Sequence, residues 1–162
     1  MEYTVRKAEA GDLPRLLALY ENARAFMRSR GNPNQWGTTT PSGEQLVQDI
    51  DNGDLYVLQD RTAIHGAYFF KICDDPTYRV IEQGSWHADR EYGVLHRVAG
   101  DGSGGILKAA VGYAQQFCDY LRMDTHVRNQ PMQAALARRG FSFCGVIHLL
   151  NGAERLAYDR LK

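Results

Sequence analysis

The spacing of hydrophobic residues divides the first half of the chain into helices and strands. Leucines and aromatic residues recur every three to four positions between Leu13 and Arg28, which predicts an amphipathic helix with Asp12 as its N-cap. A shorter helix is expected over residues 44–50, where Ser42 is the cap. Two apolar runs at 55–59 and 63–72 follow, and the tight turn between them predicts a β-hairpin.

The second half alternates between the two kinds of spacing. Strands are predicted at residues 94–99, 121–126, 141–149 and 155–158, helices at 106–118 and 130–139, and residues 78–83 form either a short strand or a loop arm. Residues 3–7, near the N-terminus, are predicted to form the first strand. The order β-α-α-β-β-(β)-β-α-β-α-β-β predicts an α/β fold, an α+β arrangement with a mixed sheet, in a single domain spanning residues 1–162.

The most distinctive stretch is a loop with four glycines between Gly100 and Gly105, after a strand and before an alanine-rich helix. Glycine backbones approach a ligand closely, and N–H groups at the start of a helix favour negative charge. The loop therefore suits a phosphate or pyrophosphate, although a flexible surface turn that binds nothing has the same composition. No Gly-Lys-Ser/Thr ending follows, so the loop is not a P-loop.

Composition narrows the class of partner. The 162 residues include 44% hydrophobic and 23% charged residues, and 19 basic residues balance 19 acidic ones. A net charge of zero gives no support for binding to nucleic acid or membranes, and it permits either a monomer or a homodimer. The first twenty residues contain no apolar run like that of a signal peptide, and the three cysteines have no metal-ligand spacing. We therefore expect a cytoplasmic protein with reduced thiols.

The second half resembles the GCN5-related N-acetyltransferase (GNAT) superfamily. The resemblance rests on His96-Arg97-Val98-Ala99 with the glycine loop after it, the strand 121–126, Asn129, and Arg138-Arg139-Gly140-Phe141. With the N-terminal β-α-α-β-β order, it extends over nearly the whole chain. It implies a GNAT-like acyl-CoA N-acyltransferase fold in which the fourth and fifth main strands splay apart.

The resemblance also implies acetyl-CoA as the acetyl donor and no metal. The pantetheine arm would lie between the splayed strands, and the glycine loop with the following helix would hold the pyrophosphate. The residues implied for cofactor binding are Arg97, Val98 and Ala99 by their backbone, the loop residues Gly102, Ser103, Gly104 and Gly105, and Asn129.

The chain departs from the superfamily pattern in two places. The signature Arg/Gln-x-x-Gly-x-Gly/Ala fits at Arg97 to Gly102, but Arg97 is expected in the strand rather than in the loop, and Asp101 adds a negative charge that must point outward. Leu136 occupies the position where many members have a tyrosine that protonates the leaving thiolate. Another group must therefore serve, or CoA leaves as the thiolate.

His96 is the first candidate for the base that deprotonates an amine acceptor, and Glu82 is the alternative. Strand alternation places Tyr92, Val94, His96 and Val98 on one face, so Tyr92 is a candidate acid, with Tyr78 and Cys144 as others. The sequence around His96 is equally compatible with a histidine that only forms a hydrogen bond within the sheet. A Cys144–histidine nucleophile pair lacks a nucleophile elbow, and alternation disfavours a metal site of His96, Asp124 and His126.

The acceptor is expected to be the amine of a small molecule or peptide. Trp36, Tyr78 and Trp86 are candidates for an aromatic-lined substrate pocket, and the same residues also suit core packing. A second hypothesis is a non-catalytic acyl-CoA-binding sensor module, which the leucine at position 136 favours. The two differ in whether a competent base faces the thioester.

Overall fold

The computed structural model describes residues 2–162 and contains a seven-stranded mixed sheet in the order β1-β2-β3-β4-β5-β7-β6. The strands are β1 (Thr4–Lys7), β2 (Leu55–Gln59), β3 (Ile64–Ile72), β4 (Gly93–Gly100), β5 (Tyr120–Thr125), β6 (Ser142–His148) and β7 (Glu154–Leu161). Only β4 and β5 run parallel; the other neighbouring strands are antiparallel. The predicted mixed α/β fold is confirmed, and so is the predicted hairpin of β2 and β3.

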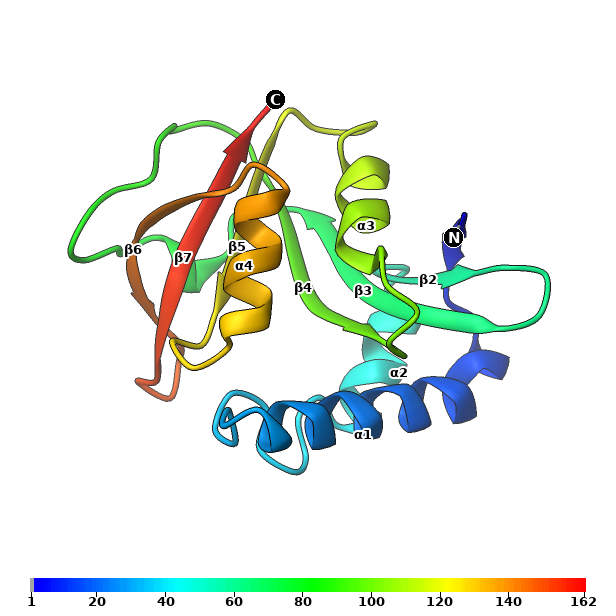
Figure 1. Cartoon of the computed structure of the whole chain (residues 1–162). Coiled ribbons are helices and arrows are strands. Elements are labelled where there is room, and N and C mark those ends of the chain that lie inside the picture. The colour runs from blue at the N-terminus through cyan, green and yellow to red at the C-terminus, as the bar shows by residue number, and fades with distance from the viewer. Residues whose placement is uncertain (1) are drawn as a thin grey trace.

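Four helices cover the two faces of this sheet (Figure 1). They are α1 (Leu13–Ser29), α2 (Gly43–Asp51), α3 (Ile106–Ala114) and α4 (Gln130–Arg138), with short 3-10 turns η1 (Ala10–Asp12) and η2 (Pro76–Tyr78). Leu107 of α3 and Leu136 of α4 pack on one face, in a core that includes Tyr68. Leu16 of α1 and Leu46 of α2 pack on the other face, over the β1–β4 half.

The other half of the α1–α2 face is covered by an arm, residues 73–92, that joins β3 to β4. Tyr78 and Tyr92 of the arm form a buried cluster with Val94 and Tyr120. The alternative of a full strand at 78–83 is not realised, because η2 turns the chain and only one isolated bridge, Glu82–Val146, reaches the sheet. Asp75 starts this turn by accepting a hydrogen bond from the Thr77 N–H ahead of Pro76.

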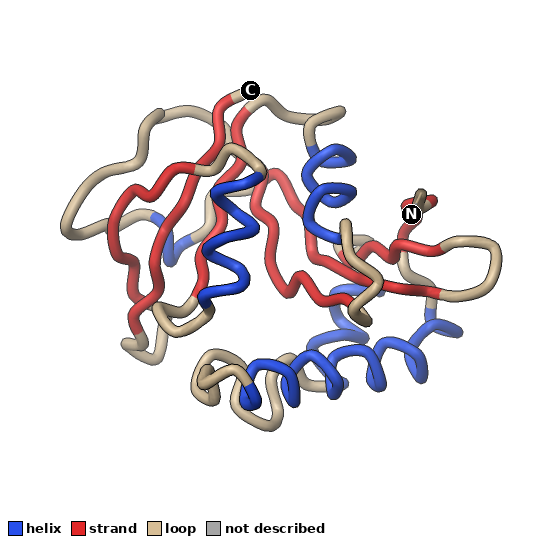
Figure 2. Tube along the Cα trace, viewed as in Figure 1, coloured by secondary structure: helices blue, strands red, loops and turns tan. Residues whose placement is uncertain are grey.

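The strands β4 and β5 separate along their length, as Figure 2 shows. They pair only at Gly93–Leu121 and Val94–Arg122, near the start of both strands. Beyond Val94 the edge of β4 that faces β5 has no strand partner. The predicted splay is confirmed, and it leaves backbone N–H and C=O groups available between the strands.

A β-bulge at Arg97 overturns part of the predicted alternation. Arg97 has φ +51°, and the β3–β4 register shifts between the Phe69–His96 and Ala67–Ala99 pairs. The extra residue places each later side chain of β4 on the opposite face of the sheet from the one that simple alternation predicts. Val98 therefore packs on the α3–α4 side, away from the face of His96, and its expected place beside His96 was wrong.

Helix α3 is shorter than expected. The alanine-rich pattern predicted a helix to Cys118, but α3 ends at Ala114. The N–H groups of Gln116 and Phe117 bond to carbonyls three residues back, so the chain tightens into turns before β5.

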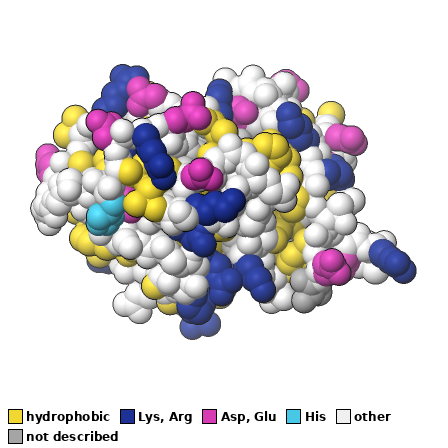
Figure 3. All heavy atoms as spheres, turned by 90° about the horizontal axis from the view of Figure 1, so that it is seen from above, with side chains coloured by type: hydrophobic (Ala, Val, Ile, Leu, Met, Phe, Trp, Pro, Cys, Tyr) yellow, Lys and Arg dark blue, Asp and Glu magenta, His cyan; other side chains and the backbone are white. Residues whose placement is uncertain are grey.

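The surface carries both signs of charge. In the view from above, Lys and Arg side chains lie on the same face as Asp and Glu, and hydrophobic side chains show between them (Figure 3). This mixture agrees with the net charge of zero. Within residues 2–162, no helix is both long enough and apolar enough to cross a bilayer.

Candidate active site

Two cavities meet where β4 and β5 diverge. The larger, about 730 Å³, lies between the glycine loop, α3 and α4. The smaller, about 270 Å³, lies between β4, β5 and the loop 31–41. Both are lined by Met27, Val98, Asn129 and Met132, so the cavities share a wall at the splay.

The larger cavity has the features of an anion site at one end. Gly102, Gly104 and Gly105 adopt positive φ values of +94°, +85° and +74°. Gly105 is the N-cap of α3, and no side chain caps that helix, so its first N–H groups remain open to a ligand. Basic side chains from two helices, Lys108 and Arg138, also line the cavity.

Asp101 also lines the larger cavity, but its carboxylate is engaged by basic side chains outside the glycine loop. Its carboxylate lies 2.7 Å from His65 Nδ1 and 3.6 Å from an Arg15 nitrogen. Its other oxygen accepts the Ser103 N–H at 3.0 Å, while the Tyr3 hydroxyl donates to the Gly104 carbonyl at 2.6 Å. These contacts stabilise the conformation of the glycine loop and neutralise the charge of its one acidic residue, Asp101.

The residues predicted for cofactor binding fall into three groups. Val98, Ala99, Gly102, Gly104, Gly105 and Asn129 line the larger cavity. Ser103 does not line it and instead lies beside His65. Arg97 lines the smaller cavity, and its side chain points to α2, where Nε donates to Asp49 at 2.8 Å.

Asn129 is engaged within the protein. Its Oδ1 caps α4 by accepting the Met132 N–H, and its Nδ2 donates to Gln35 Oε1 at 2.9 Å. The loop 31–41 is thereby tied to the start of α4, above the splay.

His96 lies in the smaller cavity between two carboxylates. Its Nε2 is 2.9 Å from Asp75 Oδ2, and its Nδ1 is 3.7 Å from Asp124 Oδ2. Burial opposes the charge on Asp75, but hydrogen bonds from His96 and Thr77 outweigh it and lower the pKa of Asp75 to about 2. Asp75 is therefore ionised at neutral pH, when a carboxylate can only accept hydrogen bonds. His96 Nε2 then carries a proton, which leaves a lone pair on Nδ1 whenever the ring is neutral.

The two candidate tyrosine acids lie behind this pair. The Tyr78 hydroxyl donates to Asp124 Oδ2 at 2.6 Å, and burial, with the charge of Asp124, raises the pKa of Tyr78 well above its usual value. The Tyr92 hydroxyl accepts the Asp75 N–H at 2.8 Å. Both tyrosines border a separate surface hollow beside Trp86 and Arg122. They position the carboxylates next to His96.

The remaining candidates are spread over three places. Glu82 is exposed on the arm and lines neither cavity. Trp36 lines the smaller cavity and packs against Tyr20. Trp86 stacks on Arg122 and donates from Nε1 to the Tyr78 carbonyl, outside both cavities.

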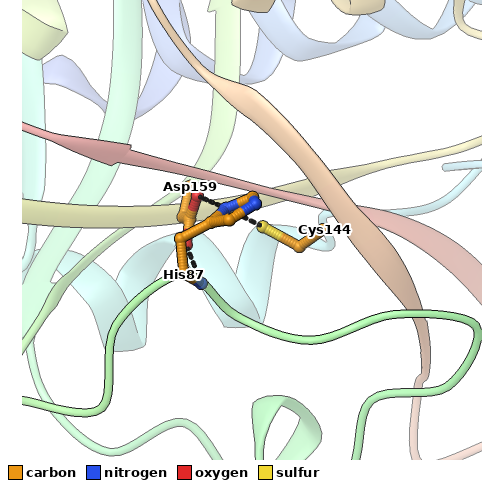
Figure 4. Close-up of side chains that lie close together, drawn as sticks. All are labelled: His87, Cys144 and Asp159. Atoms are coloured by element: carbon orange, nitrogen blue, oxygen red, sulfur yellow. Dashed lines mark hydrogen bonds and ion pairs between the residues drawn. The ribbon is translucent and has the colours of Figure 1, made fainter.

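Cys144 lies in a compact cluster with His87 and Asp159 (Figure 4). His87 Nδ1 is 2.7 Å from Asp159 Oδ1 and 3.4 Å from Cys144 Sγ. Burial and the Asp159 carboxylate raise the pKa of the Cys144 thiol to about 12, so this cysteine is not a thiolate nucleophile. The distance of 2.7 Å between His87 Nδ1 and Asp159 Oδ1 is that of a direct hydrogen bond. Two ligand atoms on one tetrahedral zinc ion would lie roughly 3.3 Å apart. The cluster thus fastens the arm to β6 and β7.

We expect Asp159→Asn to destabilise the protein by about 1–3 kcal/mol at pH 7. Hydrogen bonds from Tyr120 and His87 outweigh burial and lower the pKa of Asp159. Its stabilisation is therefore complete above the unfolded pKa of about 3.9 and is lost as pH falls through the lower folded value. Urea unfolding should show a large difference between variant and wild type at pH 7 and a smaller one in acid. Asp89→Asn, an exposed change on the same arm, is the control, and equal losses for both would contradict the assigned role.

Sequence reasoning missed Asp75 and Arg155. Asp75 reads as part of a turn, and Arg155 as a polar position near the start of a strand. Both line the smaller cavity, and Arg155 is buried. Their roles depend on contacts between distant segments, and no local signal marks either one.

Comparison with known proteins identifies relatives by structure. No family model matches the chain, and no curated protein matches it either. An acetyltransferase of the GNAT family from Streptococcus agalactiae 2603 is 26% identical, covers 99% of this chain and 95% of its own, and superposes with a TM-score of 0.87.

Two more distant structures share the fold. A ribosomal-protein-alanine N-acetyltransferase from Brucella melitensis is 20% identical, with 98% and 99% of the two chains covered and a TM-score of 0.66. An N-acetylglutamate synthase from Neisseria gonorrhoeae, complexed with coenzyme A and N-acetyl-glutamate, is 15% identical, with 99% of this chain and 35% of that chain covered and a TM-score of 0.61. Together with the splayed β4–β5 pair and the glycine loop before α3, the similarity to the Streptococcus agalactiae acetyltransferase supports membership of the GCN5-related N-acetyltransferase superfamily.

Proposed function

We propose that the protein is an N-acetyltransferase that moves the acetyl group of acetyl-CoA to the amine of a small molecule or peptide in the cytoplasm. The observation that carries this proposal is the position of His96, paired with Asp75, in a cavity that meets the glycine-loop cavity at the splay. A base beside the end of a cofactor channel is what amine acetylation requires. The CoA-bound synthase from Neisseria gonorrhoeae, which shares the fold, supports the choice of cofactor.

Acetyl-CoA would enter along the larger cavity. The open N-terminus of α3 and the glycines from Gly102 to Gly105 would hold the pyrophosphate, while Lys108 and Arg138 add positive charge. The unpaired edge of β4 beyond Val94 offers backbone groups to the amides of the pantetheine arm. This path leads the thioester to the wall that the two cavities share.

His96 would accept the proton of the acceptor amine on Nδ1. The imidazolium that forms lies between Asp75 and Asp124, and the negative charges of both stabilise it.

The neutral amine nitrogen then bonds to the thioester carbon, the C–S bond breaks, and the nitrogen releases its second proton to solvent to give the amide. A backbone N–H on the open edge of β4 would stabilise the developing oxyanion. The electron pair of the broken bond goes to sulfur, and the proton on His96 passes to the thiolate directly or through solvent. Leu136 is fully buried in the α3–α4 core, so the position of the usual tyrosine supplies no acid.

We expect calorimetry to show micromolar acetyl-CoA binding, and a thiol-release assay to show turnover with at least one amine in a broad panel. Binding without turnover of any amine would favour the sensor module instead. No binding of acetyl-CoA would reject the proposed activity, and the similarity would then concern the fold alone. A panel that contains both small amines and short peptides separates the two acceptor classes.

A further inference from the structure

Arg155 is a buried cation without an acidic partner. Its residue is 7% exposed, and its terminal nitrogens donate only to main-chain carbonyls, Nη1 to Glu154 at 2.9 Å and Nη2 to Gln35 at 3.0 Å. Among residues 2–162, no ion pair joins this guanidinium to a carboxylate. Burying a charge without a counter-charge is costly, so this arrangement needs an explanation.

The other arginines nearby are compensated. Arg97, which lines the same cavity, is paired with Asp49 at 2.8 Å. Arg122 is also buried, but its guanidinium lies over the rings of Trp86, Tyr92 and Tyr120, outside this cavity. Among these three, Arg155 alone lines the smaller cavity without an ion-pair partner.

The acidic side chains of the cavity, Asp75 and Asp124, form no ion pair with Arg155, although the charge of Asp124 partly offsets the lowering of the Arg155 pKa by burial. Asp75 and Asp124 flank His96, while Arg155 comes from the start of β7. The cavity therefore offers carboxylates to an ammonium group and a guanidinium to an anion. Arg fits a carboxylate in particular, through two parallel N–H···O bonds. The volume of about 270 Å³ suits a ligand of amino-acid size.

We propose that the acceptor is a small amine that also carries a carboxylate, such as an amino acid, and that Arg155 binds this carboxylate while the amine faces His96. This inference rests on the proposed function, because it assigns the acceptor to the same site. The carboxylate replaces the missing counter-charge of Arg155 and orients the amine toward the shared wall of the cavities.

The test is a thiol-release assay with matched acceptors: L-amino acids, β-alanine and 4-aminobutyrate, each against its primary amide, plus dipeptides with free carboxylates. Wild type should use at least one carboxylate acceptor with a kcat/KM roughly 10- to 100-fold above that of its amide. Arg155→Gln should remove this preference by raising KM for the acid, and Arg155→Lys should restore part of it. Arg128→Gln, which removes an exposed cation, is the control.

The outcomes separate the two proposals. If amines and amides react as well as the acids, or if Arg155→Gln keeps the preference, the carboxylate site is wrong while the transferase stands. Acetyl-CoA affinity, measured for each variant, confirms that the substituted protein is folded. If no amine reacts, calorimetry with the same acids decides: binding to wild type that Arg155→Gln abolishes supports the site, and no binding overturns it.

Discussion

Replacing His96 by glutamine is expected to lower kcat by roughly 10²- to 10⁴-fold while leaving the affinity for acetyl-CoA unchanged. Glutamine keeps a polar side chain beside Asp75 but cannot take the proton of the amine. The loss should therefore appear in turnover with saturating acceptor, measured by thiol release, and calorimetry should give the same dissociation constant for acetyl-CoA as in wild type.

Glu82→Gln is the matched control for this experiment. Glu82 was the alternative base in the sequence, but it is exposed on the arm and lines neither cavity. Its substitution should change kcat by less than about twofold, because no proton-transfer role is assigned to it. A larger loss in Glu82→Gln than in His96→Gln would move the base from β4 to the arm and contradict the proposed mechanism.

The second large effect concerns the anion end of the larger cavity. Gly104→Glu is expected to raise the dissociation constant for acetyl-CoA by more than about 100-fold, since it places a carboxylate beside the helix terminus that is proposed to hold the pyrophosphate. Gly104 also has a φ of +85°, so any side chain there adds strain of roughly 1–2 kcal/mol. Calorimetry measures the first effect, and thermal unfolding the second.

Gly152→Glu separates charge at the site from backbone strain. Gly152 has the same φ of +85° and open space around its Cα, but it lies in the turn between β6 and β7. Both variants should lose similar stability, and only Gly104→Glu should lose the cofactor. Equal acetyl-CoA affinities in the two variants would mean that the glycine loop does not hold the pyrophosphate.

The general fold was predictable because local patterns carry it. Apolar spacing located the helices and the strands of the sheet, and the glycines between strand and helix marked the loop that lines the larger cavity. The bulge at Arg97 was not predictable, since positive φ at an arginine has no signature in the sequence. That one extra residue moved Val98 to the other face, where it lines both cavities.

The surroundings of the proposed base were harder to predict than its position in the fold. His96 was a candidate because of its place on a strand, but its partner Asp75 is 21 positions away along the chain. The pairing exists because η2 turns the arm back over β4, and that geometry depends on packing of Tyr78 and Tyr92 against distant strands. Arg155 is a similar case, because its proposed role follows from its burial without an ion pair, and only the folded structure shows that.

The wall shared by the two cavities has a thermodynamic consequence. Met27, Val98, Asn129 and Met132 line both cavities, so a ligand in one cavity that shifts these side chains would change the binding of a ligand in the other. Gln35 extends this contact, because its side chain bonds Asn129 and its carbonyl bonds Arg155. Thermodynamic linkage makes this coupling reciprocal. If bound acetyl-CoA changes the affinity for the acceptor by some factor, bound acceptor changes the affinity for acetyl-CoA by the same factor.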